Sequence, residues 1–393
     1  MHGNFAIQKL GRRLRIAMIG GAGHSLIGPV HRAAARFDDL FEISASVLSS
    51  DPERSRAAGD ALGIPRSYAS VEEMFAGEKL RADPIDAVAI ATPNDSHYSL
   101  CVEALSQGFH VICDKPLTNT LSEAIALREV AEKSGRILVL THNYSGYPMV
   151  RQAREMVRAG VLGKVQQIHG VYALGQMATL FEDKAETTPN SMIWRVDPER
   201  GGASHVLMDI GTHVQHLAHY VTGLEVTDVC TDLGAVVAGP RAHDSANIMF
   251  RLENGGFGTM WTTKAAAGAS KLELEVYGEA GGLHWRQSDA GNLCYLRQNQ
   301  PPQMLGRQIS ALSELARGAM RGPGYHFAEG YREAFANIYA DFARLIVAKI
   351  KDTAVPECVL QVPGITDGIR TMRFVEACLR SSSERRWISL EEV

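Results

Sequence analysis

The fold is decided by the stretch IAMIGGAGHSLIG, residues 16–28. Its first four residues are apolar and predict a buried strand, and the glycines after them predict a tight turn into a helix. Gly21 and Gly23 let the backbone come close to a pyrophosphate, whose charge suits the start of a helix, and Ser25 adds a hydroxyl donor. The third glycine of the G-x-G-x-x-G pattern comes late, at Gly28. The alternative is a strand-to-helix turn without a ligand.

Short apolar runs alternate with amphipathic segments from Leu14 to about Leu140. The runs are continuous or nearly so, as in strands buried on both faces, and they cover residues 14–19, 41–48, 87–91, 110–113 and 137–140. Between them, residues 52–62, 96–107 and 120–133 have a helical spacing of apolar residues. This alternation predicts a doubly wound parallel sheet in a first domain, residues 1–142.

The pattern changes after about Pro148. Residues 150–158 and 209–222 are predicted as helices, and residues 245–252, 257–263 and 272–277 as strands that bury one face. The turn ENGG, residues 253–256, predicts a hairpin between the first two of these strands. We therefore predict a second α/β domain, residues 143–393, with a large, mostly antiparallel open sheet. Helical stretches at 328–350 and 364–380 close the chain, and we expect the last helix to pack back on the first domain.

Composition excludes several other classes of protein. The formal net charge of the 393 residues is −4 and the basic residues are scattered, which gives no surface for nucleic acid. No apolar run reaches the ~20 residues that a membrane helix needs. The basic and apolar start of the chain runs directly into the glycine turn without a cleavage pattern, so we expect a cytoplasmic protein. The six cysteines lie far apart and predict neither disulfides nor a zinc site.

The end of the second predicted strand carries serines where an acid often holds the ribose hydroxyls of a dinucleotide. Ser49 and Ser50, with Arg54 nearby, suit a ribose 2′-phosphate, so NADP is slightly favoured over NAD. Asp51 could hold the ribose instead, or it could cap the next helix with Pro52 at the first position. We favour the cap.

Two more segments follow strands of the first domain, at the edge where open α/β sheets bind ligands. In Thr92-Pro93-Asn94 the proline fixes a turn, and Asn94 and the nearby His97 can point at a ribose or a substrate. The alternative for this segment is a turn with a helix cap. Lys115 follows the next strand and precedes a proline, which disfavours a helix, so we expect its side chain to face the crevice between the domains.

Asp209 and His213 stand four residues apart on a predicted helix and therefore on one face. A carboxylate beside a histidine fixes its tautomer and stabilises the imidazolium, which suits a general base. The alternative is a structural helix whose acid complements the dipole. His205, His216 and His219 lie close in sequence, but no cysteine or H-E-x-x-H pattern accompanies them, so we expect no metal.

Three segments together resemble the Gfo/Idh/MocA family of glucose–fructose oxidoreductases, inositol dehydrogenases and rhizopine catabolism proteins. They are ATPNDSH (91–97), CDKPL (113–117) and GGASHVLMDIGTH (201–213). The resemblance spans nearly the whole chain and extends to Trp194-Arg195 and Gly160-x-x-Gly163. It implies an N-terminal Rossmann domain and a catalytic role for Lys115. The family's usual glutamate is Asp114 here, and the glycine loop is longer by two residues.

We therefore expect an NAD(P)-dependent oxidoreductase acting on a CH–OH group of a sugar, sugar derivative or cyclitol, as a homodimer or homotetramer. His213 removes the hydroxyl proton, Asp209 orients His213, and Lys115 stabilises the alkoxide. The expected cofactor-binding residues are Gly21, Gly23, His24, Ser25, Ser49, Ser50, Arg54, Thr92, Pro93, Asn94, His97, Asp114, Lys115, Asn143, Trp194 and Arg195. The expected substrate contacts are Lys115, Tyr144, Tyr147, Asp209 and His213.

Other functions are compatible with this fold. A tightly held cofactor could shuttle hydride between two substrates or support reactions of glycosides. A sugar- or cofactor-sensing regulator could share the fold, since fold does not fix function, but a sensor has no need of Lys115, Asp209 and His213 together. A metal-dependent hydrolase would work without nicotinamide and lose activity with chelators.

Overall fold

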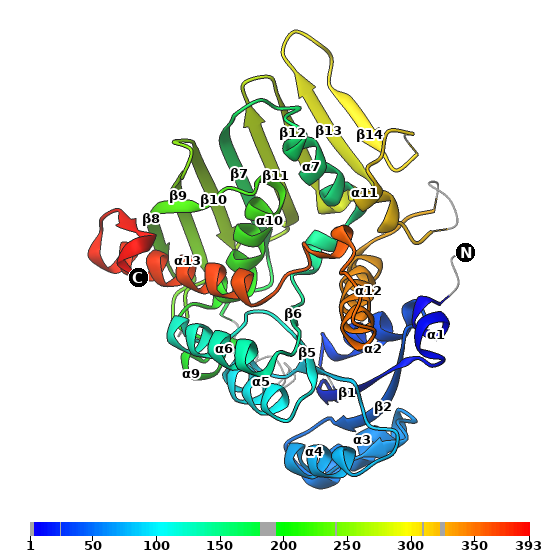
Figure 1. Cartoon of the computed structure of the whole chain (residues 1–393). Helices are drawn as coiled ribbons and strands as arrows, with labels where there is room; N and C mark the ends of the chain where they lie inside the picture. Colours follow the sequence, from blue (N-terminus) through cyan, green and yellow to red (C-terminus); the bar gives the residue numbers. More distant parts are fainter. Residues whose placement is uncertain (1–3, 24, 181–193, 240–241, 309, 323–326) are drawn as a thin grey trace. The chain divides into compact units, whose positions relative to one another are not determined.

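The structure is a computed structural model that describes residues 4–23, 25–180, 194–239, 242–308, 310–322 and 327–393 (Figure 1). The chain divides into two compact units. The first holds Met1–Asn143 and Phe335–Gly368, and the second holds Tyr144–Ala334 and Ile369–Val393. Among the residues described, no helix is both long and apolar enough to cross a membrane.

The first unit contains a six-stranded sheet in the order β3-β2-β1-β4-β5-β6, with every pair parallel. The strands are β1 (Leu14–Gly20), β2 (Phe41–Val47), β3 (Arg66–Ser67), β4 (Ala87–Ala91), β5 (His110–Cys113) and β6 (Leu138–Leu140). The strand order reverses between β1 and β4, which is where doubly wound sheets bind nucleotides. The predicted Rossmann sheet is therefore confirmed, and its long strands lie within a residue or two of the predicted runs.

Helices cover both faces of this sheet, with α2 on one and α5 and α6 on the other (Figure 1). The helices of the unit are α1 (Phe5–Leu10), α2 (Gly28–Phe37), α3 (Pro52–Ala61), α4 (Val71–Lys79), α5 (His97–Ser106) and α6 (Leu121–Ser134), joined by most of α12 (Tyr331–Ile350). Helix α12 packs through Phe342, which stacks on Phe41 of β2 at 6.0 Å between ring centroids. Local signals set the helix ends: Thr120 and Glu123 form a capping box on α6, and Gly135 ends it in the left-handed conformation.

The second unit contains a nine-stranded sheet in the order β14-β13-β12-β11-β7-β10-β9-β8-β15. The strands are β7 (Val165–Leu174), β8 (Val226–Gly234), β9 (Ser245–Leu252), β10 (Phe257–Thr263), β11 (Ser270–Gly278), β12 (Gly281–Arg286), β13 (Asn292–Arg297), β14 (Gln303–Gly306) and β15 (Ile388–Ser389). Only the β7–β10 pair among them is parallel, and β9 and β10 form the predicted hairpin. The prediction of a large, mostly antiparallel sheet is confirmed.

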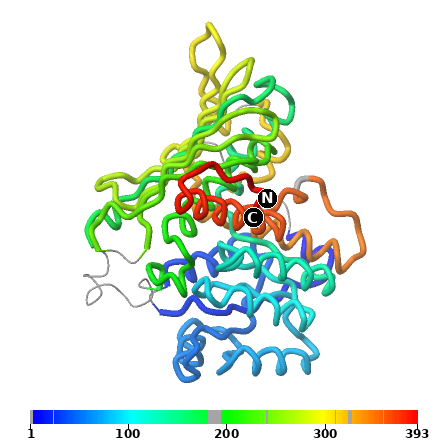
Figure 2. Tube along the Cα trace, turned by 90° about the vertical axis from the view of Figure 1, so that its left-hand side faces the viewer, coloured from blue at the N-terminus to red at the C-terminus, as the bar shows by residue number. Residues whose placement is uncertain are grey.

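Helices pack on one face of the second sheet. They are α7 (Pro148–Arg158), α10 (Thr212–Thr222) and α13 (Ile365–Glu384), while α11 (Glu314–Gly318) packs on α7 and α9 (Pro198–Gly201) on the turn of residues 194–196. Helix α10 crosses β7 closely, since a Cβ on Gly170 would lie 2.3 Å from Val214 Cγ1. Figure 2 shows the red end of the chain, α13 and β15, along this unit, where Ser381 Oγ of α13 accepts a hydrogen bond from Thr231 N of β8. Helix α12 belongs to the first unit from Phe335, whereas α13 belongs to the second from Ile369.

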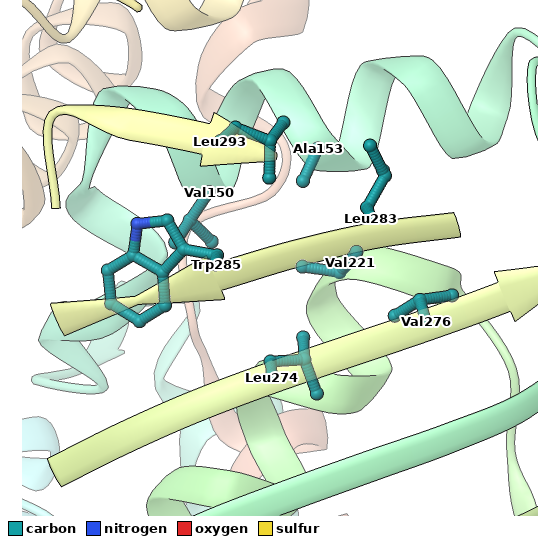
Figure 3. Close-up of a pocket in the computed structure, with 8 residues that line it drawn as sticks. All are labelled: Val150, Ala153, Val221, Leu274, Val276, Leu283, Trp285 and Leu293. Atoms are coloured by element: carbon teal, nitrogen blue, oxygen red, sulfur yellow. The ribbon is translucent and has the colours of Figure 1, made fainter. Parts of the chain in front are cut away.

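A small cavity lies between α7, α10 and the sheet of the second unit (Figure 3). Apolar side chains line it: Val150, Ala153, Val221, Leu274, Val276, Leu283, Trp285 and Leu293. A sugar or cyclitol needs hydrogen-bond partners that these side chains lack. The cavity is therefore a gap in the hydrophobic layer and not a candidate substrate site.

Candidate active site

The glycine turn between β1 and α2 is shaped by close backbone contacts. Gly20, Gly21 and Gly23 all have positive φ, which favours glycine. A Cβ on Gly28 would lie 2.3 Å from Gly21 O, so Gly28 is the glycine that lets the helix approach the turn, two residues later than the usual pattern. Ser25 Oγ accepts a hydrogen bond from Gly28 N at 3.1 Å. His24, an expected cofactor contact, lies outside the described residues.

In the turn after β2, the carboxylate of Asp51 accepts a hydrogen bond from the backbone of the next helix. Asp51 Oδ1 accepts a hydrogen bond from Arg54 N at 2.8 Å, which confirms Asp51 as the N-cap of α3. Ser49 Oγ accepts one from Asp51 N at 3.1 Å. Arg54 is largely exposed and lies 3.7 Å from the Asp51 carboxylate. Ser49 and the exposed Ser50 therefore stand at the strand end where an acid would hold a ribose.

His97 joins the turns after β4 and β5, at the start of α5. It is fully buried, with Nδ1 2.8 Å from Pro116 O and Nε2 3.1 Å from Thr92 O. Burial lowers the pKa of His97, although the two carbonyls oppose this. The expectation that His97 points at a ribose or a substrate is wrong, because the first turn of α5 turns its ring toward the backbone beside Lys115.

The neighbouring β4 turn lies against the glycine turn. A Cβ on Gly20 would be 2.6 Å from Thr92 Cγ2, and Thr92 Oγ1 accepts a hydrogen bond from Ser96 Oγ at 2.7 Å. Pro93 directly precedes a 3₁₀ turn, Asn94–Ser96, in which Asn94 is buried. This turn and the glycine turn thus form one surface at the switch point of the sheet.

Asp114 and Lys115 directly follow β5, and the Lys115–Pro116 peptide bond is cis. The Asp114 carboxylate accepts a hydrogen bond from Thr141 Oγ1 and lies 3.8 Å from Nε2 of the buried His31. His31 Nδ1 is in turn 2.7 Å from the Tyr339 hydroxyl. Burial by itself would raise the pKa of Asp114, but His31, the Lys115 charge and the Thr141 hydroxyl outweigh it and lower that pKa. Lys115 therefore stands beside a fixed carboxylate anion.

These residues fit a dinucleotide. The glycine cradle leaves no room for a side chain between Gly21 and Gly28, and it stands at the switch point of a parallel sheet. Asn143 adds a polar group: its side chain is fully buried, and neither Nδ2 nor Oδ1 has a hydrogen-bond partner among the described residues. An amide in this state suits a ligand that supplies both a donor and an acceptor.

A second group of site residues belongs to the second unit. Asp209 stands on a π-helical turn, Leu207–Gly211, that leads into α10, so the helical segment begins before the predicted residue 209. His213 lies edge-on to Tyr144, with ring centroids 4.7 Å apart. The Tyr144 hydroxyl is 2.7 Å from that of Tyr172 on β7. The structure thus brings Tyr144 to His213, as a shared substrate site requires.

Burial and charge keep both tyrosines neutral. Burial raises the pKa of Tyr144 well above its usual value. Burial, aided by the charge of Asp209, raises the pKa of Tyr172 to about 12. Both hydroxyls can therefore donate hydrogen bonds at neutral pH. Tyr147 stacks on Tyr144 with ring centroids 6.1 Å apart and contacts the Trp285 ring at 5.2 Å, and its expected contact with the substrate stays a prediction.

Lys264, directly after β10, is ion-paired with Asp209. Neither Lys264 nor Tyr172 was predicted, because 55 residues separate Lys264 from Asp209 and no local pattern links them. Trp194 and Arg195 occupy a 3₁₀ turn beside α9, with the Arg195 guanidinium 5.0 Å from the Trp194 ring. Their expected contact with the cofactor stays a prediction.

The described histidines do not form a metal centre. Burial and the charges of neighbouring histidines lower the pKa of His216 well below its usual value. Among the described residues, no group of three or more histidine, cysteine, aspartate or glutamate side chains could hold a metal ion.

Known proteins resemble the chain over nearly its full length. Residues 14–155 match the family described as "Oxidoreductase family, NAD-binding Rossmann fold", and residues 150–284 match the family described as "GFO/IDH/MocA C-terminal domain". YfiI, an uncharacterized oxidoreductase of Bacillus subtilis, is 35% identical over 95% of this chain and 96% of its own.

Solved structures agree. An oxidoreductase from Sinorhizobium meliloti is 41% identical, with a TM-score of 0.84 over 96% of this chain and 99% of its own. An inositol dehydrogenase homolog from Azotobacter vinelandii with NAD⁺ is 33% identical, with a TM-score of 0.89 over 96% of this chain and 97% of its own. The structure of the inositol dehydrogenase homolog with NADH and myo-inositol is 31% identical in sequence, with a TM-score of 0.87 over 97% of this chain and 98% of its own. Taken with the glycine cradle and the two sheets, these similarities show that the chain is an oxidoreductase of the Gfo/Idh/MocA family, with an NAD-binding Rossmann domain.

Proposed function

We propose that this protein oxidises a secondary alcohol group of a sugar, a sugar derivative or a cyclitol, with NAD or NADP as the hydride acceptor. The observation that carries the proposal is the cluster of His213, Tyr144 and Tyr172, in which the charge of Asp209 acts on Tyr172. It combines a base with two neutral hydroxyl donors, which suits a ligand rich in hydroxyl groups. The myo-inositol bound by the Azotobacter protein supports the same class of substrate.

Each residue has a defined task in this reaction. His213 takes the hydroxyl proton, Asp209 fixes the tautomer of its ring, and Lys115 stabilises the negative charge that develops on the oxygen. When bound, the nicotinamide supplies the hydride acceptor at its C4. The alcohol loses its O–H and C–H bonds and gains a C=O bond, so that one hydride leaves with the cofactor and one proton passes through His213 to water.

The cofactor pocket favours NADP slightly within this proposal. Ser49 and Ser50 stand where a carboxylate would repel a 2′-phosphate, while the nearest acid, Asp51, caps α3. The exposed Arg54 adds a positive charge at the same turn.

We also propose that the protein forms a homodimer or homotetramer through the face of the second sheet that its helices leave open. Met249, Phe257 and Trp261 alternate with buried residues on β9 and β10 and are 50%, 53% and 38% exposed. Large apolar side chains grouped on one exposed face are typical of an interface.

A substrate screen tests the proposed reaction. The purified protein is incubated with NAD or NADP and a panel of cyclitols, aldoses, glycosides and sugar acids, and the absorbance of reduced nicotinamide is followed. We expect turnover with at least one polyhydroxylated ring and none with its fully O-methylated analogue. A folded protein that binds the cofactor but reduces it with no member of the panel would contradict the proposal.

A further inference from the structure

Lys264 is a buried lysine outside the catalytic set of the proposed reaction. Its side chain is only 4% exposed, and its Nζ is ion-paired with Asp209 Oδ2. A buried ammonium group is stable when it is paired, so this carboxylate accounts for a lysine in the interior. Asp209 itself is 28% exposed, and the pair therefore has one buried end and one partly open end.

The backbone of Lys264 is anchored on both sides. Lys264 N donates a hydrogen bond to Asp244 O at 2.9 Å, and Lys264 O accepts one from Met177 N at 2.8 Å. The carboxylate of Asp244 accepts hydrogen bonds from Val236 N and Val237 N, at 2.9 and 3.1 Å. Because the peptide is fixed at the ends of neighbouring strands, the ammonium group is held at one place against Asp209.

The same carboxylate acts on the surroundings of His213. The charge of Asp209 helps to raise the pKa of Tyr172, whose ring centroid lies 6.3 Å from that of His213. Asp209 also precedes His213 by four residues, close to one helical turn. We therefore expect a change in the charge of this carboxylate to act on His213 as well as on Tyr172.

We propose that Lys264 is a positioning residue for the oxidation: through its ion pair it fixes Asp209 and offsets part of that negative charge, so that His213 is a neutral base at neutral pH. This inference rests on the proposed function, in which His213 takes the hydroxyl proton. A histidine beside an uncompensated carboxylate would be held as the imidazolium, which accepts no proton.

Three titratable neighbours of His213 that the structure describes within the second unit contribute little charge at neutral pH. Burial keeps Tyr144, Tyr172 and His216 neutral by shifting their pKa values away from 7. Two charged groups from other helices lie near the later part of α10. Arg154 of α7 lies over the Tyr220 ring, and Arg370 of α13 is paired with Glu225. The pair of Asp209 and Lys264 is thus a charged feature of the described cluster that substitution can alter.

A purely structural role for Lys264 makes a different prediction. If the ion pair only stabilises the fold, removal of the lysine lowers the free energy of unfolding and leaves the titration of His213 where it was. If it tunes the base, removal of its charge moves that titration upward, and an arginine, which keeps the charge, restores it.

The test compares Lys264→Met, which keeps the length of the chain but removes the charge, with Lys264→Arg. Lys133→Met, at a helical surface position with a 79% exposed side chain, controls for the same loss of net charge. The titration of His213 is read in the protein without substrate, from the pH dependence of hydrogen exchange at its ring C2 by peptide mass spectrometry. The pH profile of kcat/KM is read separately on an alcohol that the screen identifies.

We expect the His213 midpoint to rise by about one pH unit in Lys264→Met, and the acidic limb of kcat/KM to follow it. Lys264→Arg and Lys133→Met should both keep the wild-type midpoint. An unchanged midpoint in folded Lys264→Met overturns the inference. Absence of alcohol oxidation would count against the proposed function alone, because the exchange measurement needs no turnover.

A second comparison covers the case in which Lys264→Met does not fold. Asp209→Asn is then compared with the double variant Asp209→Asn/Lys264→Met, which contains neither charge of the pair. The lysine left in the single variant should depress the His213 midpoint below that of the double variant. Equal midpoints in these two proteins would overturn the inference.

Discussion

At the scale of single residues, Lys115 occupies a turn whose neighbours are fixed. Asp114 is held by Thr141, and Pro116 O is held by His97. Lys115→Ala should therefore fold and bind the cofactor normally, while kcat falls by about 10² or more through loss of one charge-stabilising group. The measurement is steady-state kinetics with a cofactor titration, with Lys133→Ala as the surface control. Near-normal turnover in cofactor-loaded Lys115→Ala would remove this lysine from the mechanism.

The choice between NAD and NADP depends on Ser49. The wild-type protein should bind NADP at least as well as NAD, since Ser49 and Ser50 stand at the strand end and Asp51 caps α3. Ser49→Asp should weaken NADP binding by about tenfold, through repulsion of the 2′-phosphate, and leave NAD binding nearly unchanged. Calorimetric titration of both cofactors into both proteins measures this. A strong wild-type preference for NAD would show that an acid holds the ribose hydroxyls.

Single residues also show what a sequence can reveal. Asp209 and His213 were identifiable because they share one short helical segment. Lys264 was not identifiable, because its partner in the ion pair, Asp209, lies 55 residues away in the sequence. His97 was identified as a site residue but assigned the wrong direction, since a sequence does not show that its ring turns to Thr92 O and Pro116 O.

At the scale of elements, the entry of α2 is limited by backbone contact. Gly28→Ala would place a methyl group 2.3 Å from Gly21 O, so the helix must shift away from the turn. We expect the free energy of unfolding to fall by about 1–3 kcal/mol and cofactor binding to weaken with it. Thermal denaturation with and without cofactor measures both effects. Gly318→Ala, whose Cβ meets nothing within 4 Å, is the control and should be close to neutral; equal behaviour of the two variants would show that the contact is unimportant.

Elements were predictable where their burial is simple. The runs at 87–91 and 110–113 are buried along their whole length and were placed to the residue. Strand β7 was missed because Gln166, Gln167 and His169 interrupt its apolar positions and Gly170 replaces a side chain under α10. The π-helical turn at 207–211 was also unseen, since residue spacing does not distinguish it from an α-helix.

At the scale of the whole molecule, the change of periodicity near Pro148 predicted two different sheets. It did not reveal which of the two long helices near the end of the chain, α12 or α13, belongs to the first unit. Both α12 and α13 are amphipathic, but amphipathicity shows only that a helix buries a face. The partner of α12 is recognised from its aromatic contacts with Phe41 and His31.

The proposed oligomer is also tested at this scale. Trp261→Glu puts a charge in the middle of the exposed apolar face of the second sheet, and the wild-type dimer or tetramer should dissociate at least in part. Size-exclusion chromatography with light scattering gives the mass of each protein. Leu80→Glu, at an 89% exposed position of the first unit, is the matched control and should leave the mass unchanged. A monomeric wild-type protein, or a Trp261→Glu protein of unaltered mass, would contradict this interface.

The most direct measurement of the proposed reaction follows the hydrogen itself. An alcohol identified by the screen is prepared with deuterium on every carbon, and the protein is given this substrate with the oxidised cofactor. Mass spectrometry of the reduced cofactor then shows the origin of the transferred hydrogen. We predict one deuterium in each reduced nicotinamide, together with one equivalent of carbonyl product, and loss of both in His213→Ala. Reduced nicotinamide without deuterium would contradict hydride transfer from a carbon that bears a hydroxyl group.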